Sequence, residues 1–127
     1  MKKHISLGFL CLLCACHKNP KDLIQGRWQG QNIVEQGRGV GLPLDTLNWA
    51  KSFAIEFQGS QATVSVPAES PRSGKFKVIR KEDNLLTLQF TRPGGTYDES
   101  LFRMDADGKT LYWLWKEGSE LVMHKVQ

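Results

Sequence analysis

Apolar and polar residues alternate in short runs along most of the chain, and turn-forming residues separate the runs. Phe53, Ile55 and Phe57, for example, alternate with Ala54 and Glu56. A repeat of two residues is typical of a β-strand that turns one face toward the core. Glycine, asparagine and aspartate fall between the runs, where tight turns favour them. The pattern therefore predicts a series of strands joined by turns.

The runs predict about eight strands, over residues 26–35, 53–57, 62–66, 74–80, 85–90, 99–104, 110–115 and 121–126. Short connections between consecutive strands favour an antiparallel up-and-down arrangement. Because closure of the sheet removes exposed strand edges, we expect a small all-β barrel. The longest connection predicts one short helix near residues 45–51, with Asp45 as its N-cap.

The N-terminal segment has a different character. Lys2 and Lys3 precede an apolar run over residues 5–15, which is typical of the charged and apolar regions of a signal peptide. A helix that spans a membrane needs about 20 apolar residues. The shorter run therefore predicts an export signal that is removed from the mature protein.

The three cysteines of the chain all lie near the end of this segment. A zinc site needs four ligands, whereas these thiols lie in an apolar run, and a disulfide between Cys11 and Cys14 would join residues that are discarded. Leu13, Ala15 and Cys16 instead resemble the lipobox of bacterial lipoproteins. The resemblance implies cleavage before Cys16, a diacylglycerol thioether on its sulfur and an acyl chain such as palmitate on its new amine. A secretory signal without lipid is the alternative.

These assignments divide the chain into a signal peptide (1–15), a lipid-anchored tether (16–21) and a barrel domain (22–127). Removal of residues 1–15 leaves 112 of the 127 residues, enough for one domain with one core. The formal charge falls from +4 to +2, because the signal contains two lysines and no acidic residue. A chain with so small a net charge is not expected to bind nucleic acid.

The lipobox resemblance also implies where the protein is found. Two or more acyl chains hold a protein stably on a bilayer, so the membrane is an expected partner. His17, rather than an aspartate, follows Cys16. By analogy with enterobacterial sorting, this implies a lipid-anchored protein of the bacterial cell envelope, at the outer membrane.

The stretch that contains Gly26 and Trp28 resembles the G-x-W motif of the lipocalins, and the resemblance extends over residues 22–126. In lipocalins this tryptophan plugs the closed end of the barrel, and an arginine near the C-terminus stacks on it. Here Lys125 is the nearest cation to that position. The resemblance implies a barrel that holds one small apolar ligand. Because an eight-stranded barrel is narrow, an interior filled by side chains stays open as the alternative.

Three tryptophans are the candidate residues for a ligand site or a barrel plug: Trp28, Trp113 and Trp115. Leu111, Trp113 and Trp115 share one face of the strand over residues 110–115. Packing in the core is the alternative for Trp113, and Trp115 lies at the end of the strand. Two polar connections, over residues 67–74 and 92–100, are possible binding loops, although such segments are more often solvated hairpin ends.

No G-x-S-x-G nucleophile motif occurs, and His124 is the only histidine of the barrel domain, so we do not expect an enzyme. Residues 105–109 resemble the start of a calcium loop, but the twelfth position is Lys116 instead of glutamate. We therefore expect a plain turn there, and neither a metal nor a cofactor. The sequence predicts a lipoprotein that binds a small apolar ligand. The alternative is a filled barrel that binds an envelope protein or inhibits a hydrolase.

Overall fold

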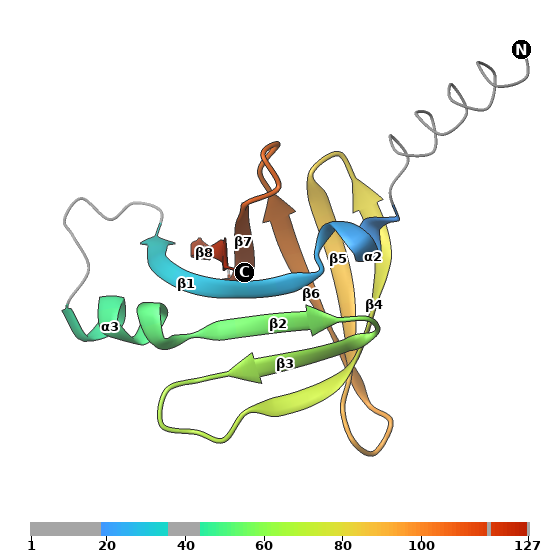
Figure 1. Cartoon of the computed structure of the whole chain (residues 1–127), viewed down its shortest axis with the longest axis horizontal. Helices are drawn as coiled ribbons and strands as arrows, with labels where there is room; N and C mark the ends of the chain where they lie inside the picture. The colour runs from blue at the N-terminus through green and yellow to red at the C-terminus, as the bar shows by residue number, and fades with distance from the viewer. Residues whose placement is uncertain (1–18, 36–43, 117, 127) are drawn as a thin grey trace, which may run out of the picture.

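Eight antiparallel strands form a closed barrel in the computed structural model of the chain (Figure 1), which describes residues 19–35, 44–116 and 118–126. Each strand pairs with its neighbours in chain order, and β8 closes the barrel against β1. The predicted all-β up-and-down barrel is thereby confirmed. The strands are β1 Gly26–Glu35, β2 Ala54–Gln58, β3 Gln61–Ser65, β4 Arg72–Glu82, β5 Leu85–Thr91, β6 Tyr97–Met104, β7 Thr110–Lys116 and β8 Ser119–Val126.

Two short helices accompany the strands in the described part of the chain. The helix α3 (Leu44–Ser52) confirms the predicted helix but begins one residue before Asp45. Asp45 therefore lies in the first turn and is not the N-cap, although its charge still suits the positive end of the helix dipole. The helix α2 (Pro20–Leu23) was not predicted, and its N-cap Asn19 accepts a hydrogen bond from the Lys21 N–H at 3.0 Å. Neither helix has the length and apolar character that crossing a bilayer requires.

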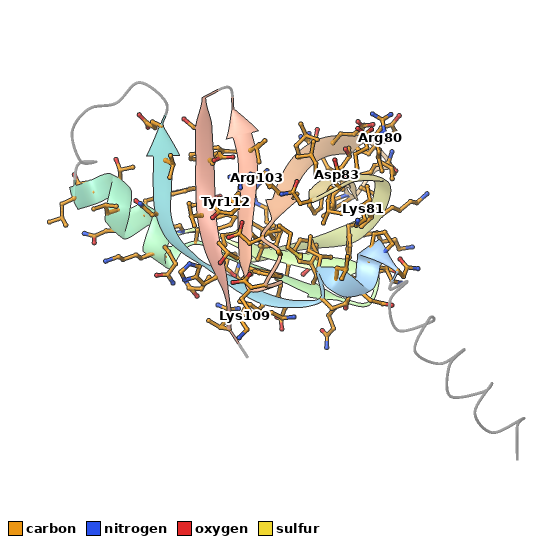
Figure 2. All side chains as sticks on the ribbon, turned by 90° about the horizontal axis from the view of Figure 1, so that it is seen from above. Arg80, Lys81, Asp83, Arg103, Lys109 and Tyr112 are labelled. Carbon is orange, nitrogen blue, oxygen red and sulfur yellow. The ribbon has the colours of Figure 1, made fainter. Side chains whose placement is uncertain are left out.

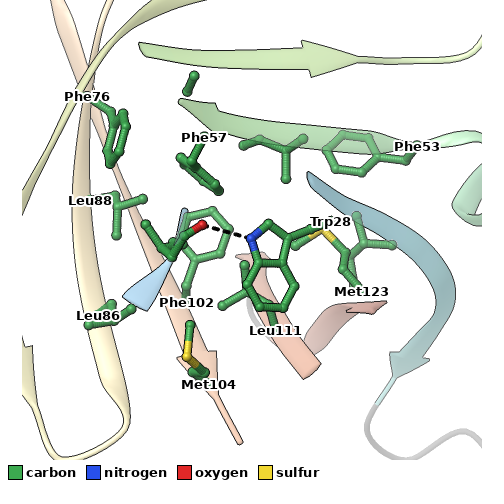
Figure 3. Packing of buried hydrophobic residues seen from close by; sticks show 14 of the residues in the cluster. Trp28, Phe53, Phe57, Phe76, Leu86, Leu88, Phe102, Met104, Leu111 and Met123 are labelled. Carbon is green, nitrogen blue, oxygen red and sulfur yellow. Dashed lines mark hydrogen bonds between the residues drawn. The ribbon is translucent and has the colours of Figure 1, made fainter. Parts of the chain in front are cut away.

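Large apolar side chains fill the inside of the barrel (Figure 3). The largest fully buried side chains include those of Trp28, Phe53, Phe57, Phe76 and Phe102. Phe57 packs edge-on against Phe76, with ring centroids 4.9 Å apart. Burial of one such side chain contributes about 1.5–3 kcal/mol to stability. The predicted inward set Phe53, Ile55 and Phe57 is confirmed, since each is 1% exposed.

Alternate turns of an up-and-down barrel lie at the same end, so each end of this barrel can be named by the helix that lies there. Gln25 joins the residues after α2 to the β2–β3 turn. Its Nε2 donates a hydrogen bond to Gly59 O at 2.9 Å, and the Gly59 N–H donates one to Gln25 Oε1 at 2.7 Å. We call this the α2 end. The β3–β4 and β5–β6 connections and α3 belong to the opposite end, which we call the α3 end.

The close approach of α3 to β1 depends on Gly30. A Cβ atom at Gly30 would lie 1.8 Å from Ala50 O, so no larger residue fits without displacing the helix. The Gly30 N–H donates a hydrogen bond to Phe53 O at 2.8 Å, and Gln29 Nε2 donates to the same oxygen at 3.0 Å. These contacts fix the C-terminal end of α3 against β1, and Ala50 is completely buried there.

Candidate ligand-binding site

Trp28 seals the α2 end of the barrel. Its side chain and that of Ile24 are both completely buried. The indole Nε1–H of Trp28 donates a hydrogen bond to Ile24 O at 2.9 Å, drawn as the dashed line in Figure 3. This bond satisfies two buried polar groups that would otherwise be costly to keep away from water. Trp28 is thus a packed core residue near the α2 end, and it does not line the cavity at the other end.

Lys125 covers Trp28 from the neighbouring strand. The two residues face each other in the register of β1 and β8. The Lys125 Nζ lies 5.6 Å from the centroid of the Trp28 ring, within the range of a cation–π interaction. Lys125, the cation that the sequence places nearest to Trp28 at the end of the chain, therefore lies over its ring.

A cavity of about 750 Å³ opens at the α3 end, between the strands from β2 to β7. Its floor is apolar and includes Ile55, Val64, Phe90, Phe102 and Trp113. This volume lies in the range of about 300–1,000 Å³ that is usual for small-molecule sites. A smaller hollow of about 230 Å³ lies at the α2 end, where Leu23 meets the β4–β5 and β6–β7 turns. The interior of the barrel is therefore not filled throughout, and the larger hollow is at the α3 end.

The lip of the cavity is polar and carries two ion pairs. Arg72 Nη2 lies 2.9 Å from Glu69 Oε1, and Arg92 Nε lies 2.8 Å from Asp98 Oδ2. A second nitrogen of Arg92, Nη2, also contacts Asp98 Oδ2. These residues come from the β3–β4 and β5–β6 regions, which contain the two polar connections noted in the sequence. The structure thus brings residues from both segments, 67–74 and 92–100, to one opening.

Trp113 forms part of the cavity wall and also packs against the core. Its ring stacks on Phe102 with centroids 5.7 Å apart and meets Phe53 at 5.5 Å. The indole Nε1 is buried, and it has no hydrogen-bond partner among the residues that the structure describes. An unpartnered buried donor costs about 1–3 kcal/mol, so this part of the wall is not optimised for stability.

Trp115 lies near the α3 end of the barrel and does not belong to the cavity lining. We call Trp115 and its partner Trp49 the rim. The Trp115 side chain is 37% exposed. It stacks on Trp49 of α3 with ring centroids 5.3 Å apart, and its ring lies 6.2 Å from that of Trp113. The sequence pattern did not identify Trp49 as a partner, because this contact requires α3 to fold back onto the barrel.

A separate group of polar side chains lies on strands β6 to β8 (Figure 2). The Arg103 guanidinium lies 3.8 Å from the centroid of the Tyr112 ring, and its Nη2 is 3.1 Å from Glu120 Oε1. The Tyr112 hydroxyl donates a hydrogen bond to Asp105 Oδ2 at 3.1 Å. Partial burial, and then this bond to a carboxylate, raise the pKa of Tyr112 above its usual value of 10.0. The group pairs its own charges and is separate from the cavity.

Residues 105–109 form a turn between β6 and β7. The Gly108 N–H donates a hydrogen bond to Asp105 O at 2.9 Å, and the Lys109 N–H donates one to Asp107 Oδ1 at 2.8 Å. Among the described residues, no three His, Cys, Asp or Glu side chains are grouped so that they could hold a metal ion. Cys16, with Leu13 and Ala15 of the predicted lipobox, lies outside the described residues.

No protein-family model and no curated protein matches the sequence. The structure is similar to that of an uncharacterized protein from Bacteroides eggerthii, with a TM-score of 0.48 and 16% identity over 81% of this chain and 99% of that one. It is also similar to a lipocalin-like protein from Bacteroides uniformis, with a TM-score of 0.48 and 14% identity over 82% of this chain and 99% of that one. The fold assignment rests on the strand pairing of this chain itself.

Proposed function

We propose that the protein binds a small, largely apolar molecule in the cavity at the α3 end. The observation that carries this proposal is a hollow of about 750 Å³ with an apolar floor, in a barrel whose other end is sealed by Trp28. Removal of apolar ligand surface from water contributes about 25 cal/mol per Å². The core below the cavity would contact the apolar part of such a ligand. The polar end of the ligand would stay in contact with water at the lip.

We propose further that a lipid on Cys16 holds the protein on a membrane of the bacterial cell envelope. The support is the signal-like segment over residues 1–15 and the lipobox-like Leu13, Ala15 and Cys16. The first described residue, Asn19, caps α2 and so belongs to the α2 end. An anchor at Cys16 would therefore attach beside the sealed end, and the cavity would open on the side away from the attachment point.

A second candidate function is binding of another envelope protein through the rim. The stacked Trp49 and Trp115 favour it, together with Leu44, whose side chain is 70% exposed. Aromatic side chains with one exposed face are common in the centres of protein interfaces. This function would use the rim and not the cavity, so substitutions in the cavity and at the rim should affect ligand binding and protein binding separately.

The test uses Ser100→Phe, because Ser100 lines the cavity and a phenylalanine there would project into it and obstruct it. Leu101→Phe is the matched control, since Leu101 is 40% exposed and adjacent residues of a strand point to opposite faces. The full chain with Cys16→Ser is titrated with the uncharged fluorophore N-phenyl-1-naphthylamine. We expect saturable binding that Ser100→Phe abolishes and Leu101→Phe retains.

Binding that is equally strong in both variants would refute a ligand site in the cavity. For the second candidate, Trp115→Ser is the relevant variant. It should leave binding of the fluorophore in place but weaken cross-linking to an envelope protein in intact cells. If Ser100→Phe weakens that cross-linking and Trp115→Ser does not, the rim is not the interface.

A further inference from the structure

We propose that the ligand of this cavity is a neutral amphiphile, with an apolar body and an uncharged polar head that offers hydroxyl, ester or amide groups. The inference rests on the proposed ligand site and specifies its chemical class. It follows from the charges and hydroxyls at the lip, because the apolar floor by itself would accept any chain of suitable size.

The charged side chains that line the cavity form two pairs of opposite sign. Arg72 is paired with Glu69 at 2.9 Å, and Arg92 is paired with Asp98 through both Nε and Nη2. These four are the charged members among the described lining residues, so the formal charge of the lining is zero. A charged head would therefore meet two dipoles and no net charge of opposite sign.

A charged head loses part of its hydration at the lip, where the paired side chains are 50–83% exposed, and the lip offers no net opposite charge to offset this loss. A carboxylate could bind the N–H groups of Arg92 that Asp98 does not use, but it would then lie beside the Asp98 carboxylate, and the two negative charges would repel each other. An ammonium would meet the same problem at Arg92 if it took Asp98 as its partner. A neutral head loses less hydration and leaves both ion pairs in place.

Hydroxyl groups between the ion pairs offer hydrogen bonds to such a head. Ser70 and Ser100 belong to the lining, and each hydroxyl can both donate and accept. The Ser73 hydroxyl already bonds to Thr63 Oγ1 at 2.8 Å on the neighbouring strand. Donor and acceptor groups that can switch role suit a head with hydroxyl or ester oxygens better than one that only donates or only accepts.

The experiment compares three probes that share a ten-carbon chain and differ in head charge. These are 1-decanoylglycerol, decanoate and decylammonium, each used below its critical micelle concentration. The full chain with Cys16→Ser is titrated by tryptophan fluorescence, since Trp113 forms part of the wall. We expect the neutral probe to bind about tenfold more tightly than either ion, and Ser100→Phe to abolish binding of all three.

Asp98→Asn tests whether charge pairing at the lip sets this order. It leaves the Arg92 guanidinium without its carboxylate, and we expect the affinity for decanoate to rise about fivefold at low salt. Asp107→Asn is the matched control. It removes the same charge from the β6–β7 turn at the α2 end, so the order of the three probes should not change.

Tighter binding of decanoate or decylammonium than of the neutral probe, still abolished by Ser100→Phe, would overturn this inference and leave the ligand site intact. An unchanged affinity for decanoate in Asp98→Asn would also count against it. If none of the probes and no N-phenyl-1-naphthylamine binds saturably, the proposed function itself is wrong.

Discussion

Lys125 lies across the β1–β8 pairing from Trp28, and its Nζ is 5.6 Å from the centroid of the Trp28 ring. The aliphatic part of Lys125 also approaches β1, because a Cβ at Gly26 would be 3.0 Å from Lys125 Cε. The Lys125 side chain thus lies over both the Trp28 ring and the start of β1. The contact connects the first and last strands at the sealed end of the barrel.

Replacement of Lys125 by methionine should lower the free energy of unfolding by about 0.5–1 kcal/mol. Methionine keeps much of the apolar cover but removes the charge that faces the ring. Lys77→Met on β4 is the control, since Lys77 is exposed. Urea denaturation measures both variants. An equal effect of the two changes would show that the charge over Trp28 is not stabilising.

Trp28→Phe and Trp113→Phe should differ although the chemical change is the same. Trp28→Phe removes the bond to Ile24 O and leaves a buried carbonyl without its donor, at a cost of about 2–4 kcal/mol. Trp113→Phe removes a donor that has no partner in the described part of the chain. Its cost should be smaller by at least about 1 kcal/mol. A loss of unfolding free energy that is equal or larger for Trp113→Phe would contradict this account.

Stability should fall above about pH 10, in part because of Tyr112. Its pKa is raised in the folded state, so the unfolded chain releases this proton at a lower pH than the folded one. The contribution is complete below the unfolded pKa and is lost as the pH rises through the folded pKa. Tyr97 and Tyr112 are the only tyrosines, so the ultraviolet titration of Tyr97→Phe reports Tyr112 alone. A midpoint at or below 10 would refute the shift.

Cys16→Ser should abolish both the acylated mass and the membrane association of the protein in a bacterial host that processes lipoproteins. Cys14→Ser is the matched control. It changes a thiol inside the segment expected to be removed, so both properties should persist. Membrane association that survives Cys16→Ser undiminished would mean that lipid on this residue is not the anchor.

The strands could be predicted because the sequence pattern that marks each strand lies within the strand and its flanking turns. The bounds of β1 were predicted without error, since alternation and flanking turn residues mark the strand within a few positions. The helix α2 was missed, because four residues are too few to show a helical period. Asp45 was misplaced by one residue for a related reason, since the ends of helices are less sharply marked than their interiors.

The cavity could not be predicted, because it depends on how far apart the strands lie at the α3 end. Ser100 and Arg92 are ordinary residues of a hairpin in the sequence, and the pairing of β4, β5 and β6 brings them to the same opening as Glu69 and Arg72. The need for glycine at position 74 also depends on how the strands pair. A Cβ there would lie 2.8 Å from Thr91 O, so its place in the wall is decided by contact with β5. Contacts of this kind are determined by the register of the paired strands, which the amino-acid sequence does not show directly.

The pairing of β1 with β8 also bears on how the protein is made. Arg27 pairs with Val126, although β1 is the first strand to be synthesised and β8 is the last of the eight. Until β8 arrives, one edge of β1 has no partner, and an unpaired edge is a place where chains aggregate. Closure also joins distant segments, which slows folding. A cell that makes this protein must therefore keep separate copies apart until the eighth strand is available to each.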